Sequence, residues 1–282
     1  MQIEKLHPLF AARLTGLDLR TPLDSDEFEL LNQAQDRFGL LLFPDQPLSD
    51  AQLLAFAGQF GPLQTTALMG DAENHLIRVT NLDTAGNILP KGDGYRARME
   101  ANRLWHTDST YLPVRATLSM LLARIVPPSG GETEFCDTRV AYESLTEQRK
   151  AGLGHLVARH SLAHSRRLTG FSGWTAQELQ RLPPPVPRSL VQRHEGSGRN
   201  ALCLASHIES VDGMTNEQAE ALLAELTERA TEPPHVYRHR WSVSDLLIWD
   251  NRCTMHRLCP YDEYGVKRQL VSTRVLDTGN RA

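Results

Sequence analysis

Cysteine is scarce in this sequence, and its placement excludes several common frameworks. Of 282 residues only four are cysteines, and no two of them form a C-x-x-C pair. The sequence therefore predicts neither a zinc ribbon nor a thioredoxin-like redox motif. Because the first residues, MQIEKLHPLF, lack the basic start and apolar stretch of a secretory signal, we expect a cytoplasmic protein with free thiols.

Long hydrophobic runs and a strong excess of one charge are also missing. No stretch approaches the roughly 20 apolar residues of a membrane-spanning helix, so we expect no membrane partner. The formal net charge is −4 and basic residues form no long cluster, which disfavours nucleic acid as a partner. A share of 40% hydrophobic and 23% charged residues is typical of globular proteins. We expect a small-molecule partner, and homo-oligomerisation stays open.

Three segments have the pattern of amphipathic helices. The first runs from about Asp24 to Arg37. The second follows a capping box at 49–52 and ends before Gly61-Pro62, and the third follows a capping box at 215–218.

Short strand-like runs make up much of the remainder. They lie at 38–43, 75–79, 117–126, 189–194, 200–205, 235–241, 246–249 and 267–276. Because these runs do not alternate regularly with helices, we expect a mainly β fold with peripheral helices rather than a doubly wound parallel sheet. Residues 1–282 read as a single domain, in which the long irregular segments 64–101 and 165–188 are expected to cover an active site.

The motif HTD places an imidazole and a carboxylate two positions apart, at His106 and Asp108. If this stretch is a strand, both side chains project from the same face and reach toward one point. A third ligand is expected from His256, which follows the strand-like run LLIW. Two histidines and one carboxylate leave one side of a metal open, as a non-haem Fe(II) requires to bind a co-substrate and O₂. Three protein ligands also suit catalytic zinc, so the ligand types leave the metal open.

Four longer stretches extend this pattern beyond the three ligands. They are LWHTDSTY, VPPSGGETEFCDTRVAYESL, SGRNALCLASHIESVDGM and VYRHRWSVSDLLIWDNRCTMHR. Together they resemble the Fe(II)/2-oxoglutarate-dependent dioxygenases of the taurine dioxygenase-like family, with the nearest likeness to the 2,4-dichlorophenoxyacetate dioxygenase group. The resemblance implies a double-stranded β-helix (jelly-roll) core. It also implies Fe(II) bound by His106, Asp108 and His256, with 2-oxoglutarate as co-substrate and O₂ as oxidant.

The resemblance assigns roles to four further residues. Thr133 and Arg268 match the positions that hold the distal carboxylate of 2-oxoglutarate, where a guanidinium can form two parallel bonds. Asn102 and His207 match positions that line the substrate pocket in these enzymes.

One position departs from the family. These enzymes commonly carry a second arginine four residues after the co-substrate arginine, where it binds the substrate anion, and this chain has Ser272 there. Arg274 lies on the same face of a strand and is one candidate replacement. Lys91 and Arg103, in or beside the first long segment, are the others.

The implied activity is hydroxylation of a small anionic substrate, first of all an aryloxyalkanoate such as 2,4-dichlorophenoxyacetate. Hydroxylation beside the ether oxygen would give a hemiacetal that collapses to a phenol and glyoxylate, while 2-oxoglutarate yields succinate and CO₂. The alternatives are a dioxygenase acting on a sulfonate, an alkyl sulfate or an amino-acid derivative, a zinc hydrolase, and a non-catalytic jelly-roll binding protein. The joint presence of all three ligands, Thr133 and Arg268 favours the dioxygenase.

Overall fold

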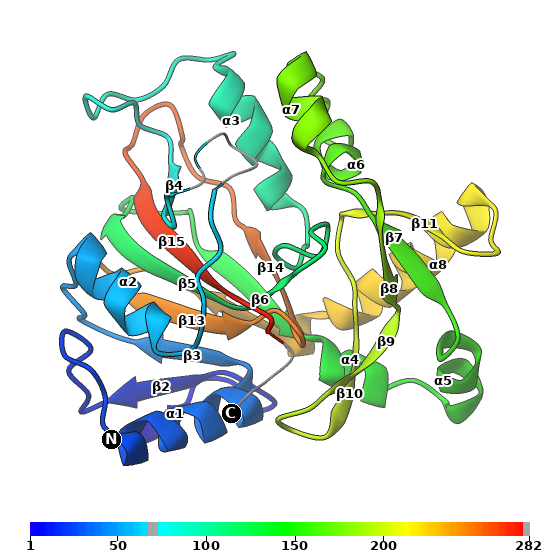
Figure 1. The fold of residues 1–282 in the computed structure, drawn as a ribbon, viewed down its shortest axis with the longest axis horizontal. Coiled ribbons are helices and arrows are strands. Elements are labelled where there is room, and N and C mark those ends of the chain that lie inside the picture. Colours follow the sequence, from blue (N-terminus) through cyan, green and yellow to red (C-terminus); the bar gives the residue numbers. More distant parts are fainter. Residues whose placement is uncertain (67–70, 72, 279–282) are drawn as a thin grey trace.

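The structure is a computed structural model that describes residues 1–66, 71 and 73–278. Its largest element is a seven-stranded sheet in the order β1-β2-β3-β13-β5-β15-β4 (Figure 1). Its neighbouring strands are antiparallel except for β2 and β3. The strands are β1 (Gln2–Lys5), β2 (Ala12–Thr15), β3 (Leu40–Phe43), β13 (Leu246–Asp250), β5 (Ala116–Ile125), β15 (Gln269–Leu276) and β4 (Ile77–Thr80).

Three smaller sheets complete the β structure. Their orders are β12-β6-β14, β11-β7-β8 and β10-β9. The strands are β12 (Val236–His239), β6 (Thr133–Asp137), β14 (Thr254–Leu258), β11 (Ile208–Val211), β7 (Val157–His160), β8 (Val186–Ser189), β9 (Val191–His194) and β10 (Arg199–Leu202). Residues 195–198, which include two glycines, join β9 to β10 in an antiparallel hairpin.

The large sheet is buried on both faces at its centre. Along β5, Met120 and Leu122 belong to the apolar cluster that includes side chains of α1 (Ser25–Phe38) and α2 (Asp50–Gly58). Leu121, between them, belongs to a second cluster that includes Phe135 of β6. Alternating strand residues therefore bind the helices to one face and the small β12-β6-β14 sheet to the other.

The three predicted helices are confirmed together with the residues that begin them. Asp24, Ser49 and Thr215 cap α1, α2 and α8 (Asn216–Ala230), each in a complete capping box. The remaining helices are short: α3 (Gly94–Met99), η2 (Glu100–Arg103), α4 (Thr138–Glu143), α5 (Glu147–Leu153), α6 (Leu162–Arg167), α7 (Ala176–Arg181) and η3 (Pro233–His235). Among the helices in the described part of the chain, none combines the length and apolar character needed to cross a membrane.

The mainly β fold with peripheral helices is thus confirmed, but the two long segments are less irregular than expected. Segment 64–101 contains β4 and α3, and segment 165–188 contains α7 and β8; residues 67–70 and 72 lie outside the described residues. The two segments contact each other (Figure 1), since Arg98 of α3 forms an ion pair with Glu178 of α7 at 2.7 Å. The Arg98 guanidinium also lies over the ring of Trp174.

Candidate metal centre

Backbone pairing brings His106 and His256 together. The His106 N–H donates to the His256 carbonyl at 3.0 Å, and the His256 N–H donates to the His106 carbonyl at 2.8 Å. The expected strand at 106–108 does not form: His106 makes only this isolated bridge, and a turn begins at Asp108. Ser109, with a φ of 58°, continues that turn. The turn and the bridge, rather than strand alternation, therefore bring the carboxylate back beside the two imidazoles.

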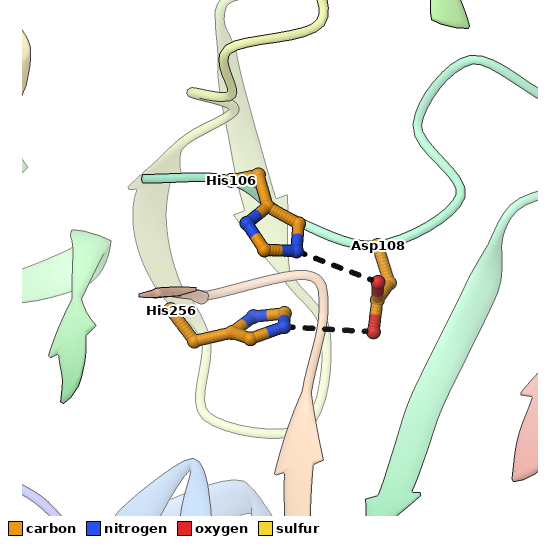
Figure 2. Close-up of side chains that lie close together, drawn as sticks. All are labelled: His106, Asp108 and His256. Atoms are coloured by element: carbon orange, nitrogen blue, oxygen red, sulfur yellow. Dashed lines mark ion pairs between the residues drawn. The ribbon is translucent and has the colours of Figure 1, made fainter. Parts of the chain in front are cut away.

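The ligand-type atoms of His106, Asp108 and His256 all lie within 4.8 Å of one another, and the three side chains are buried (Figure 2). Each histidine Nε2 lies 3.9 Å from a carboxylate oxygen of Asp108. The Leu104 carbonyl, 2.8 Å from His106 Nδ1, can only accept a hydrogen bond. The proton of His106 therefore sits on Nδ1, and the Nε2 lone pair faces Asp108.

Burial keeps the two imidazoles in the form that binds metals. It lowers the pKa of His106, and burial together with the neighbouring His106 lowers the pKa of His256 to about 3. His256 packs against the rings of Phe135 and Trp249, whose centroids lie 5.7 and 4.7 Å from its own. Neutral, rigidly packed imidazoles fit a divalent cation, because protonation does not compete with coordination.

Three neighbours orient the Asp108 carboxylate. Ser119 Oγ donates to Oδ2 at 2.8 Å, and Arg274 Nη2 donates to Oδ1 at 2.7 Å. Asn251 donates from Nδ2 to Ser119 Oγ at 2.8 Å and accepts the Asp108 N–H at 3.3 Å. Burial alone would raise the pKa of Asp108, but the charge of Arg274 and the hydrogen bond from Ser119 lower it below its ordinary value. The carboxylate is ionised, as a metal ligand must be.

A cavity, here called the metal cavity, adjoins these three side chains. Polar residues from distant parts of the sequence meet in it. Its lining is Val79, Asn102, His106, Asp108, Leu121, Thr133, Trp249, His256, Leu258, Arg268, Ser272 and Arg274. A second cavity shares Asn102 and Arg268 with it and is also lined by Arg96 and Met99 of α3.

Arg268 brings an unneutralised positive charge to the metal cavity. It is 2% exposed, and its Nε donates to the Gly131 carbonyl at 3.2 Å. None of the described residues forms an ion pair with it, and burial lowers its pKa to about 10. Thr133 Oγ1 accepts from Trp241 Nε1 at 3.0 Å, so its hydroxyl proton stays available to an acceptor in the cavity.

Three of the expected substrate residues lie outside the lining of the metal cavity. Lys91 is exposed. Arg103 forms ion pairs with Glu100 at 2.9 Å and Glu263 at 3.0 Å, so its charge is already neutralised. His207 is buried, with its ring centroid 6.0 Å from that of His106 and edge-on to it.

The structure adds site residues that sequence reasoning missed. Ser119 and Asn251 orient Asp108, and Tyr111 packs its ring edge-on to His207 at 4.7 Å. Arg166 is buried on α6, which packs against η2. Asn251 stands beside the strand-like run LLIW in the stretch WDNR, a place where asparagine is typical of a turn, so the sequence does not mark it as a site residue. Buried and exposed arginines look the same in a sequence.

A second cluster of ligand-type side chains, His194, Asp250 and Cys253, lies elsewhere in the described residues. Asp250 already binds Arg252 at 2.5 Å and His194 at 3.0 Å. Arg139 also acts on the pKa of Cys253, which burial raises well above its usual value. Two nearby guanidinium groups and a protonated thiol disfavour a cation, so this cluster is a structural ion-pair network.

The chain is similar in sequence and in fold to known dioxygenases. The family model for "Taurine catabolism dioxygenase TauD, TfdA family" matches residues 2–273. The alpha-ketoglutarate-dependent 2,4-dichlorophenoxyacetate dioxygenase of Cupriavidus pinatubonensis is 40% identical over 278 residues, covering 96% of this chain and 96% of the relative. The (S)-phenoxypropionate/alpha-ketoglutarate-dioxygenase of Sphingobium herbicidovorans is 35% identical over 272 residues, covering 92% and 90%. The crystal structure of AAD-2 in complex with Mn(II) and N-oxalylglycine has a TM-score of 0.90 at 39% identity and covers 98% and 97% of the two chains.

Proposed function

The chain belongs to the taurine catabolism dioxygenase TauD, TfdA family, and on that premise we propose that it is an Fe(II)- and 2-oxoglutarate-dependent dioxygenase that cleaves the ether bond of an aryloxyalkanoate such as 2,4-dichlorophenoxyacetate. The observation that carries the proposal is a buried His-Asp-His set beside an unneutralised buried guanidinium in one cavity. The named activities of relatives at 40% and 35% identity support the substrate class.

The core of the fold is a double-stranded β-helix. Support comes from the apolar cluster between the β13-β5-β15 part of the large sheet and the smaller β12-β6-β14 sheet. The metal ligands lie at the edge of this cluster, where His256 of β14 contacts Phe135 and Trp249.

His106, Asp108 and His256 hold the metal. The donor set fits Fe(II), because two neutral imidazoles and one carboxylate leave coordination positions for a chelating keto acid and O₂. When bound, the iron supplies the oxidising chemistry that couples decarboxylation of 2-oxoglutarate to hydroxylation of a substrate C–H bond.

Arg268 and Thr133 hold the distal carboxylate of 2-oxoglutarate. The main-chain N–H of Arg268 donates to Asn81 Oδ1 and the guanidinium Nε donates to the Gly131 carbonyl. The remaining N–H groups of the guanidinium have no carboxylate partner among the described residues. A carboxylate arriving there would gain charge-assisted bonds that water cannot match in a buried site. The Thr133 hydroxyl adds a further donor.

The substrate occupies the Asn102, Ser272 and Arg274 side of the metal cavity. The orientation of the substrate there determines that the carbon next to the ether oxygen is hydroxylated. The resulting hemiacetal then collapses to the phenol and glyoxylate without further catalysis. Three further residues remain proposed contributors to substrate binding: Lys91, Arg103 and His207. Because they lie outside the lining of the metal cavity, they contribute only through movement or indirect contact.

Segments 64–101 and 165–188 of this single-domain enzyme cover the site and exclude water. Segment 64–101 supplies Arg96 and Met99 to the adjoining cavity. Arg98 ties it to segment 165–188 through Glu178.

The proposal is tested by measuring succinate and phenol release from Fe(II), 2-oxoglutarate and a panel of aryloxyalkanoates, sulfonates and alkyl sulfates. We expect equimolar succinate and phenol with the aryloxyalkanoates and no turnover by His106→Ala. Iron-loaded protein that consumes 2-oxoglutarate with none of the panel would overturn the proposed function. Restoration of activity by Zn²⁺ but not Fe(II) after chelation would overturn the metal assignment.

A further inference from the structure

Arginine is in excess around the metal cavity. Arg268 and Arg274 line it, and Asp108 is the one carboxylate in its lining. Arg166 lies outside this lining, on α6, which packs against the element that carries the cavity residue Asn102. A divalent metal, dianionic 2-oxoglutarate and Asp108 together carry one net negative charge. Three guanidinium groups then leave two positive charges in a buried site, which favours the binding of a further anion.

Arg166 is the least neutralised of the three. It lies in the last turn of α6 and is 9% exposed. The Arg166 carbonyl accepts the Phe171 N–H at 3.0 Å, which fixes the backbone. Its side chain forms no ion pair or hydrogen bond with the described residues, and its Nε is buried without a partner. A cation held in this way costs free energy until an anion reaches it.

Several contacts locate Arg166 on the substrate side of the metal. Helix α6 packs against η2, which carries the cavity residue Asn102. Ser161, which caps α6, donates its N–H to the carbonyl of His207 at 2.7 Å. His207 in turn packs edge-on to the ring of His106, at a centroid distance of 6.0 Å.

Arg274 alone cannot offer a substrate carboxylate a fully free guanidinium, because it already binds Asp108. Its Nη2 is committed to Asp108 at 2.7 Å. Its Nε is buried without a partner. A carboxylate normally takes two parallel N–H bonds from one free guanidinium edge, so a second group is needed for an equally strong grip.

We propose that Arg166 and Arg274 together bind the carboxylate of the substrate and so replace the arginine that the chain lacks at Ser272. The inference rests on the proposed function and adds the residue that gives specificity for anions. Arg166 comes from the start of segment 165–188, so the same segment covers the site and holds the substrate.

The test compares Arg166→Gln with Arg167→Gln, its neighbour on α6, which is exposed. Phenoxyacetate and the neutral phenoxyacetamide are titrated calorimetrically into protein loaded with Mn(II) and N-oxalylglycine. We expect Arg166→Gln to weaken phenoxyacetate binding about 10- to 100-fold, the effect of losing charge-assisted bonds. Phenoxyacetamide binding and the affinity for N-oxalylglycine should not change, and Arg167→Gln should match wild type throughout.

Arg166→Lys keeps the charge without the planar fork and is expected to recover part of the lost affinity. Equal weakening of phenoxyacetate and phenoxyacetamide binding would overturn the proposal, because it would point to a structural role of Arg166. A loss of affinity confined to N-oxalylglycine would also overturn it, because it would point to a co-substrate role. Wild-type protein that binds the acid no more tightly than the amide would overturn it as well. If Arg166 proves not to bind the substrate carboxylate while wild type still releases succinate and phenol, the proposed function stands. If wild type releases neither product, the proposed function itself is refuted.

Discussion

Replacing Arg268 should make the folded protein more stable and at the same time abolish its response to 2-oxoglutarate. Burial lowers the pKa of Arg268 to about 10 from 12.5. Since one pKa unit corresponds to about 1.4 kcal/mol, the buried cation costs the folded state on the order of 3 kcal/mol. The full cost applies below pH 10, where the arginine is protonated in both the folded and the unfolded state. It decreases as the pH rises from about 10 to 12.5, because the folded state no longer holds the proton there and no longer buries a charge.

The variant Arg268→Met removes this cost and some favourable contacts. The bond to Gly131 and the contact with the Tyr261 ring are lost. Their loss offsets about 1–2 kcal/mol of the stability gained by removing the buried charge. We therefore expect the free energy of unfolding of Arg268→Met to exceed that of wild type by about 1–2 kcal/mol without co-substrate. Lys267→Met, at the exposed neighbouring position, serves as the control.

Urea denaturation with Mn(II), with and without 2-oxoglutarate, measures both effects. Wild type and Lys267→Met should gain about 2.7 kcal/mol at a co-substrate concentration of 100 times Kd. Arg268→Met should gain almost nothing. An Arg268→Met protein that is less stable than wild type and is still stabilised by 2-oxoglutarate would refute the assignment of Arg268 to the co-substrate.

Further predictions concern the metal ligands and the covering segments. His106→Ala should lower metal affinity by at least about 100-fold, as measured by competition with a chromophoric chelator, because a three-ligand site loses an inner ligand. Ser119→Ala removes a 2.8 Å bond to Asp108 and should lower metal affinity about 10- to 100-fold; unchanged affinity would show that Ser119 does not orient the ligand. Arg98→Met breaks the ion pair with Glu178 and should raise 2-oxoglutarate consumption that is not coupled to product, with faster proteolysis in segment 165–188. Equal coupling in Arg98→Met and wild type would contradict the covering role.

Local signals in the sequence predicted much of the fold. The capping boxes at Ser49 and Thr215 marked the starts of α2 and α8, because a side chain that bonds the backbone three residues later acts within one turn. The apolar run at 117–126 identified β5, although a continuous run does not tell which neighbours a strand pairs with. Its partners, β13 and β15, come from the last part of the chain.

The structure brings together the three side chains that the sequence predicts as metal ligands, but through a different local structure from the expected strand. The convergence of His106 and Asp108 depends on a turn through Ser109 and on a bridge to His256. A positive φ at serine and a pairing between distant segments leave no periodic signal. The same limit applies to Arg166, since its burial follows from the packing of α6 against η2 and not from its neighbours in sequence.

The central claim, that His106, Asp108 and His256 bind one metal beside Arg268, is tested most directly by anomalous diffraction from crystals grown with Mn(II) and N-oxalylglycine. The predicted result is one strong peak at about 2.0–2.3 Å from an atom of each ligand, with the distal carboxylate of N-oxalylglycine on Arg268 and Thr133. A peak at His194, Asp250 and Cys253 instead, or N-oxalylglycine bound away from Arg268, would contradict it.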